Sequence, residues 1–123
     1  MSGKTILYVE DNEYNRKIVR RLLGDPSYRL IEAEDGESGV AQAFQELPDL
    51  ILMDVQLPKM SGLEATRILR ADVRTKHIPI VIITSFALSG DRERAADAGA
   101  AGYLAKPYSP GELLALVRKF LPE

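Results

Sequence analysis

The chain has 123 residues, of which 28% are charged, and a formal net charge of −2. These values are ordinary for one soluble globular domain, and the near-neutral charge gives no basic field for direct binding of nucleic acid. The absence of cysteine excludes disulfide bonds, thiolate catalysis and zinc sites built on cysteine. No apolar run approaches the roughly 20 residues that cross a bilayer, so we expect no membrane contact and a cytoplasmic location.

The first predicted strand covers residues 5–9 and leads into two acids, Glu10 and Asp11. A helix is predicted over residues 12–23, because apolar side chains recur there at helical spacing. These apolar side chains are Ile18, Val19, Leu22 and Leu23. The basic residues of the same helix are expected to face water, and they are Arg16, Lys17, Arg20 and Arg21.

The second unit is a weaker strand candidate, residues 28–33, followed by a helix that Pro48 ends. The apolar positions of that helix are Val40, Phe44 and Leu47. The third strand, residues 50–54, is a run of four apolar residues that ends in Asp54. Such a run is typical of a strand that is buried on both faces of a parallel sheet.

The last two strands also end in polar side chains. The fourth strand, residues 80–83, leads into the hydroxyls of Thr84 and Ser85, and the fifth, residues 103–105, leads into Lys106. Helix starts are predicted in the remaining connections, at Ser61, at Gly90-Asp91 and at the capping box Ser109-Pro110-Gly111-Glu112.

Strand and helix therefore alternate five times, which predicts parallel strands joined by right-handed crossovers. We expect a three-layer, doubly wound α/β domain of the flavodoxin-like type, with a five-stranded parallel sheet in the order 2-1-3-4-5. One domain is expected to occupy residues 1–123 with no output domain, and Met1 and the short carboxyl tail favour a stand-alone protein.

In such a sheet the carboxyl ends of all strands meet at one edge, and the first and third strands are neighbours. Asp11 and Asp54 should therefore meet, although Asp54 alone would equally suit a turn or a helix cap. Two carboxylates about 4 Å apart repel by roughly 4 kcal/mol at an effective dielectric constant of 20. Together with Glu10 they require cations, and we expect Lys106 and a divalent ion with oxygen ligands, Mg²⁺. A backbone carbonyl from the loop after Asp54 could add a ligand.

A carboxylate beside Mg²⁺, a lysine and a hydroxyl can attack phosphorus and form an acyl phosphate. The cations would offset charge on the phosphoryl oxygens. His77 is the only histidine of the chain. Because it lies in a polar connection, we expect it at the surface rather than in a phosphorelay.

Three other classes fit the sequence less well. A P-loop NTPase would need a strand and an earlier glycine before Gly3-Lys4-Thr5. A haloacid-dehalogenase-type phosphatase would carry an Asp-x-Asp motif, but Gln56 stands where the second aspartate of that motif would be. A flavodoxin-like flavin carrier would need a phosphate-binding loop where the acidic residues 10–13 stand.

The motifs together resemble the receiver domain of two-component response regulators, over essentially the whole chain. The motifs that carry this resemblance are Val9-Glu10-Asp11-Asn12-Glu13, Met53-Asp54-Val55-Gln56-Leu57-Pro58, Met60-Ser61-Gly62, Thr84-Ser85 and Lys106-Pro107. Each motif is weak alone, but their order at the strand ends is specific. The sequence is most similar in character to CheY-like single-domain regulators of the DivK type.

The resemblance implies a role for each strand-end residue. Asp54 would be the phosphoacceptor, Asp11 would bind Mg²⁺ directly, and Glu10 would do so directly or through water. The Gln56 carbonyl would be the third protein ligand of the metal. In the remaining roles, Lys106 would pair with the phosphoryl group, Thr84 would be the switch hydroxyl and Tyr103 the aromatic switch that turns inward when Thr84 moves.

Three finer features also follow from the resemblance. The Lys106-Pro107 peptide bond is expected to be cis. Glu10 stands where the commonest pattern has aspartate, which leaves open whether it contacts the metal directly. Gln56 and Phe86 occupy loop positions that modulate phosphoryl lifetime in the family.

The resemblance also implies partners. A histidine kinase or a histidine phosphotransfer protein would donate the phosphoryl group, and a downstream protein effector would bind the face formed by the fourth helix, fifth strand and fifth helix. The chain would catalyse only its own phosphorylation and dephosphorylation, as a monomer or weak dimer. Two alternatives remain, a receiver domain excised from a hybrid histidine kinase and a pseudo-receiver that binds partners without phosphorylation.

Overall fold

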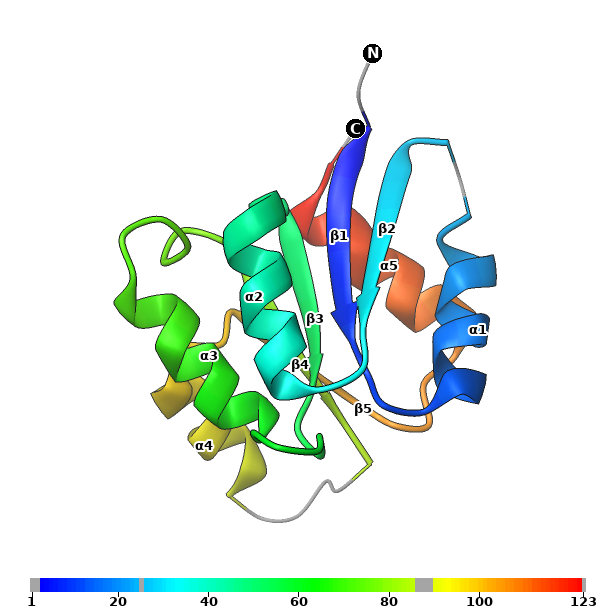
Figure 1. Cartoon of the computed structure of the whole chain (residues 1–123). Coiled ribbons are helices and arrows are strands. Elements are labelled where there is room, and N and C mark those ends of the chain that lie inside the picture. Colours follow the sequence, from blue (N-terminus) through cyan, green and yellow to red (C-terminus); the bar gives the residue numbers. More distant parts are fainter. Residues whose placement is uncertain (1–2, 25, 86–89, 123) are drawn as a thin grey trace.

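The computed structural model describes residues 3–24, 26–85 and 90–122. In these ranges, all strands form one parallel sheet with the order β2-β1-β3-β4-β5 (Figure 1). The strands are β1 (Lys4–Val9), β2 (Tyr28–Ala33), β3 (Leu50–Asp54), β4 (Ile80–Thr84) and β5 (Gly102–Ala105). This order confirms the predicted flavodoxin-like, doubly wound sheet.

A helix follows each strand, and the helices cover both faces of the sheet (Figure 1). They are α1 (Glu13–Leu22), α2 (Gly36–Glu46), α3 (Gly62–Ala71), α4 (Asp91–Ala98) and α5 (Pro110–Phe120). Helices α1 and α5 pack on one face, and α2, α3 and α4 pack on the other. The predicted three-layer architecture is confirmed. Within the described parts of the chain, no helix combines the length and apolarity needed to cross a bilayer.

The apolar runs of the sequence build two cores, one on each face of the sheet. Successive side chains of a strand point to opposite faces. Ile51 and Met53 of β3 therefore join the core under α2, α3 and α4, whereas Leu50 and Leu52 join the core under α1 and α5. All four side chains are fully buried, which explains why β3 is continuously apolar rather than alternating.

Side chains cap most of the helix starts. The capping side chains are those of Asn12, Asp35, Ser61 and Ser109, and each accepts a hydrogen bond from a backbone N–H three residues on. Ser109 and Glu112 form the predicted capping box, with Pro110 at the first helical position. These caps fix where α1, α2, α3 and α5 begin, and therefore the length of the loops at the carboxyl edge of the sheet.

Three predictions about the helix faces were wrong. Ile18 was predicted on the apolar stripe of α1, but it is exposed, with 37% of its surface open to solvent. Leu47 was predicted on the apolar face of α2, but the helix ends at Glu46, and Leu47 adopts a left-handed conformation with 52% of its surface exposed. Pro48 explains this, because proline disfavours the right-handed helical conformation in the residue before it. Arg16 was predicted to face water and is buried, at 7% exposure. His77 is exposed, as predicted.

Candidate functional site

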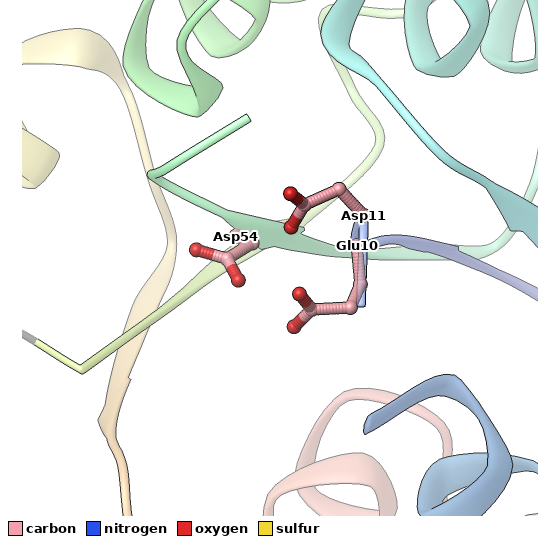
Figure 2. Close-up of side chains that lie close together, drawn as sticks. All are labelled: Glu10, Asp11 and Asp54. Atoms are coloured by element: carbon pink, nitrogen blue, oxygen red, sulfur yellow. The ribbon is translucent and has the colours of Figure 1, made fainter. Parts of the chain in front are cut away.

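Three carboxylates lie together at the carboxyl edge of the sheet (Figure 2). Strands β1 and β3 pair in parallel up to Val9 and Met53, so the next residues, Glu10 and Asp54, reach the edge at the same level. Asp11 follows Glu10, and one carboxylate oxygen of each acid lies within 4.8 Å of the others. Glu10 and Asp54 are buried, whereas Asp11 is exposed. The cluster therefore opens to solvent on the Asp11 side.

Lys106, the first residue after β5, reaches into this cluster across the end of β4, which lies between β5 and β3 in the sheet. Its Nζ lies 2.7 Å from Glu10 Oε1 and 3.0 Å from Asp54 Oδ2. Its backbone N–H donates to the carbonyl oxygen of Thr84 at 2.8 Å, which ties the lysine to the end of β4. The Lys106-Pro107 peptide bond is cis, as predicted. Burial would lower the pKa of Lys106, but Glu10 and Asp54 raise it, so the lysine is charged.

One lysine does not balance the charge of the acids. Burial, and after it the neighbouring Glu10, raises the pKa of Asp54 to about 6, although Lys106 acts in the opposite direction. Burial would also raise the pKa of Glu10, but hydrogen bonds from Asp54 and Lys106 hold this pKa below its usual value. A further cation would relieve the repulsion. Three carboxylates supply the oxygen ligands that Mg²⁺ prefers, so the residues present fit this ion.

Gln56 lies in the loop that follows β3. Its backbone N–H donates to Asp54 Oδ1 at 2.9 Å, so the loop folds back over the carboxylate. The N–H of Gly62 donates to the carbonyl oxygen of Val55 at 2.9 Å, which closes the loop at the start of α3. Gln56 is therefore held beside the cluster, and its carbonyl as a metal ligand stays a prediction.

The two residues predicted to switch lie on adjacent strands, Thr84 at the carboxyl end of β4 and Tyr103 two residues before the end of β5. Thr84 ends β4, is buried at 2% exposure and pairs in register with Ala105 of β5. Tyr103 lies on β5, is partly buried and packs against the core under α2, α3 and α4. The Arg92 guanidinium of α4 lies 5.1 Å from the centre of its ring. Phe86, predicted to affect phosphoryl lifetime, lies outside the described residues.

Two residues of the site were missed in the sequence. The buried hydroxyl of Tyr8 donates to Glu10 Oε1 at 3.1 Å, and Arg16 Nη1 donates to the Glu10 carbonyl oxygen at 2.7 Å. The signal for Tyr8 was its position two residues before Glu10, because alternate residues of a strand share a face. The signal for Arg16 was its spacing of three residues from Val19, which places both on one side of α1.

Comparison with known proteins identifies the family. Residues 6–118 match the response regulator receiver domain. The chain therefore belongs to the response regulator receiver domain family, whose members act in two-component signalling. This confirms the family that the strand-end motifs predict.

Individual relatives agree with this assignment. The polar-differentiation response regulator DivK of Brucella anthropi is 40% identical over 118 residues, which cover 96% of each chain. The receiver domain of the sensor histidine kinase PA1611 from Pseudomonas aeruginosa, with a magnesium ion in its active-site cleft, has a TM-score of 0.89 and 38% identity, covering 98% of this chain and 99% of that one. The chemotaxis protein CheY4 of Vibrio cholerae has a TM-score of 0.89 and 30% identity, covering 96% and 98%.

Proposed function

We propose that this chain is a phosphorylation-controlled switch and that Asp54 is its phosphoacceptor. The observation that carries the proposal is the buried Asp54 carboxylate, 3.0 Å from Lys106 Nζ and clustered with Glu10 and Asp11. An ionised carboxylate needs no general base to act as a nucleophile. One Asp54 oxygen forms a bond to phosphorus while the phosphorus–nitrogen bond to a histidine of a histidine kinase or histidine phosphotransfer protein breaks. The product is an acyl phosphate on Asp54, and the histidine leaves as the free imidazole.

The metal part of the proposal is a Mg²⁺ site formed by the acidic cluster. Asp11 and Asp54 would bind the ion directly, Glu10 directly or through water, and Gln56 through its backbone carbonyl. When bound, Mg²⁺ supplies positive charge that offsets the carboxylates and the phosphoryl oxygens. The raised pKa of Asp54 supports this proposal, because burial and Glu10 disfavour its ionised form and the charge of Lys106 offsets this effect only in part.

Lys106 and Thr84 would hold the phosphoryl group after transfer. Lys106 Nζ already lies between Glu10 and Asp54, so it can turn one of its three N–H donors to a phosphoryl oxygen. The Thr84 hydroxyl comes from the adjacent strand end. Lys106 also borders a pocket of about 410 Å³ between α1 and the β5–α5 loop, lined by Asn15, Ile18, Ser85, Lys106, Pro107 and Tyr108.

The output of the switch would be a changed protein-binding surface. Phosphorylation adds about −1.5 to −2 of charge for the comparable hydroxyl phosphates, and it would draw Thr84 toward Asp54. Tyr103 would then turn inward and alter the face formed by α4, β5 and α5, where a downstream protein effector would bind. Support comes from the position of Tyr103, partly buried two residues before Ala105, the register partner of Thr84.

The direct test is phosphoryl uptake from acetyl phosphate, measured by intact mass with Mg²⁺ and with a chelator in its place. We expect one phosphoryl group per chain, with uptake at least about tenfold slower without Mg²⁺, because the charge on the transferring group is then offset only by Lys106. Phosphoramidate, which has a different leaving group, serves as a second donor. No uptake from either donor at any Mg²⁺ concentration would contradict the proposal and favour a pseudo-receiver that binds partners without phosphorylation.

A further inference from the structure

Arg16 is a buried cation beside the acidic cluster that the proposed reaction does not use. Its side chain extends from α1, and the residue is 7% exposed. Its guanidinium makes contacts on two sides: Nη1 donates to the Glu10 carbonyl oxygen at 2.7 Å, and Nη2 donates to Glu13 Oε1 at 2.6 Å. Its Nε lies 3.4 Å from Glu32 Oε1 of β2. The arginine therefore joins α1, the end of β1 and β2 at one point.

These contacts fix the peptide that links two of the three acids. The backbone N–H of Glu10 donates to the carbonyl oxygen of Ala33 at 2.9 Å, and its carbonyl accepts from Arg16. A peptide group is planar, so holding the Glu10 carbonyl fixes the plane of the Glu10–Asp11 peptide and the position of the Asp11 Cα, from which its carboxylate extends. The Glu10 N–H belongs to the preceding peptide and holds the chain on the Val9 side. Figure 2 shows Glu10 and Asp11 reaching toward Asp54 from these successive positions.

We propose that Arg16 is a positioning residue of the acidic cluster, which holds the Glu10–Asp11 peptide so that both carboxylates face Asp54 and Mg²⁺ binds tightly. This inference rests on the proposed metal site. A lysine does not reproduce these contacts, because the rigid guanidinium reaches the Glu10 carbonyl and Glu13 from two separate nitrogens, Nη1 and Nη2. The lysine ammonium has all its donors on one nitrogen at the end of a flexible chain. The two carboxylates of Glu13 and Glu32 offset the charge of Arg16 and of its neighbour Arg20, so this network adds no net charge beside the metal site.

Arg20 provides a matched control on the same helix. It donates to both Glu32 oxygens at 2.7 Å, but 47% of its side chain is exposed, and among the described residues its ion pairs are with Glu32 and Glu13 rather than with Glu10. Substituting Arg20 therefore perturbs the same ionic network without releasing the Glu10 carbonyl. A loss specific to Arg16 then reports on the peptide that Arg16 holds.

The test measures the Mg²⁺ dissociation constant of the full chain by isothermal titration calorimetry, together with urea unfolding of each variant. Arg16→Met should weaken Mg²⁺ binding by about tenfold or more, the size typical of partners that orient metal ligands. Arg16→Lys should weaken Mg²⁺ binding by at least about fivefold, because the positive charge is kept but the planar pair of donor nitrogens is lost. Arg20→Lys and Arg20→Met should stay within about twofold of the wild type.

Each outcome either supports or overturns the positioning role of Arg16. Equal Mg²⁺ dissociation constants for folded Arg16→Lys and Arg20→Lys would overturn the role of Arg16. A weakening of Mg²⁺ binding in both variants that is proportional to their loss of stability would overturn it as well. If Arg16→Met does not fold, Arg16→Lys carries the comparison. A wild-type chain that binds no Mg²⁺ would instead overturn the proposed metal site itself, and the inference about Arg16 with it.

Discussion

Asp54→Asn is expected to abolish phosphoryl uptake from both acetyl phosphate and phosphoramidate. A carboxamide is neutral and a poor nucleophile, so it cannot form the acyl phosphate. Asp49→Asn is the matched control, because Asp49 lies just before β3 at its opposite end, where its Oδ2 accepts from the N–H of Thr5. Intact mass after a fixed incubation should show one phosphoryl group on the control and none on Asp54→Asn. Undiminished uptake by Asp54→Asn would rule out Asp54 as the acceptor.

The same substitution should change the pH dependence of stability. Burial and Glu10 raise the pKa of Asp54 to about 6 in the folded chain. A carboxyl group whose pKa rises on folding contributes its full stability below its unfolded pKa near 4 and loses it as the pH rises through 6. Asp54→Asn has no such ionisation. With a chelator present, its stability relative to the wild type should increase by on the order of 2 kcal/mol between pH 4 and pH 7.

Urea unfolding at a series of pH values measures this difference. The comparison uses the chelator throughout, so that no divalent cation competes for the carboxylates. Asp49→Asn, run in parallel, corrects for the loss of one acid from the chain. A difference between Asp54→Asn and the wild type that is the same at pH 4 and pH 7 would contradict the raised pKa of Asp54.

Gly62→Ala is expected to destabilise the fold by about 3 kcal/mol, the size of steric overlaps that a packed backbone cannot relieve. Gly62 begins α3, and a Cβ there would overlap the Asp54 carbonyl oxygen and lie 2.8 Å from the Asp54 carbonyl carbon. The helix could accommodate a methyl group only by moving away from the end of β3. Such a shift would also displace Asp54, so phosphoryl uptake should fall with stability.

Gly111→Ala is the matched control, because it also lies in the first turn of a helix. A Cβ at Gly111 would approach only Ser109 Oγ, at 3.9 Å. This substitution should therefore stabilise the chain by about 0.5 kcal/mol through reduced freedom of the unfolded state. Urea unfolding followed by circular dichroism measures both variants. Equal stabilities for the two would show that the contact between α3 and Asp54 is looser than the structure indicates.

Much of the fold could be predicted because the strands are easy to recognise in the sequence. The runs before Glu10, Asp54 and Thr84 are continuously apolar and stop at polar residues, so both the buried strands and the sheet edge could be located. The parallel order then placed the three strand ends together. The sequence motifs were also sufficient to identify the family, since they occur in the expected order at these strand ends.

Other features depend on three-dimensional neighbours that a linear pattern does not contain. Arg16 and the solvent-facing Arg20 are both arginines of α1, so the sequence alone does not distinguish them. The positions of Glu32 and of the Glu10 carbonyl bury the Arg16 side chain. Leu47 continues the helical spacing of α2, yet Pro48 ends the helix one residue earlier. The pKa of Asp54 depends on its burial and on its distance from Glu10, both of which are set by the pairing of β1 with β3.

The most direct test of the central claim is to locate the phosphoryl group on the chain. After incubation with acetyl phosphate and Mg²⁺, borohydride reduces an aspartyl phosphate to homoserine, and peptide mass spectrometry identifies the altered residue. We predict that the peptide containing Asp54 carries the change and that Asp11 and Glu10 do not. A phosphoryl group found instead on His77, on Ser61 or on another acid would contradict the account.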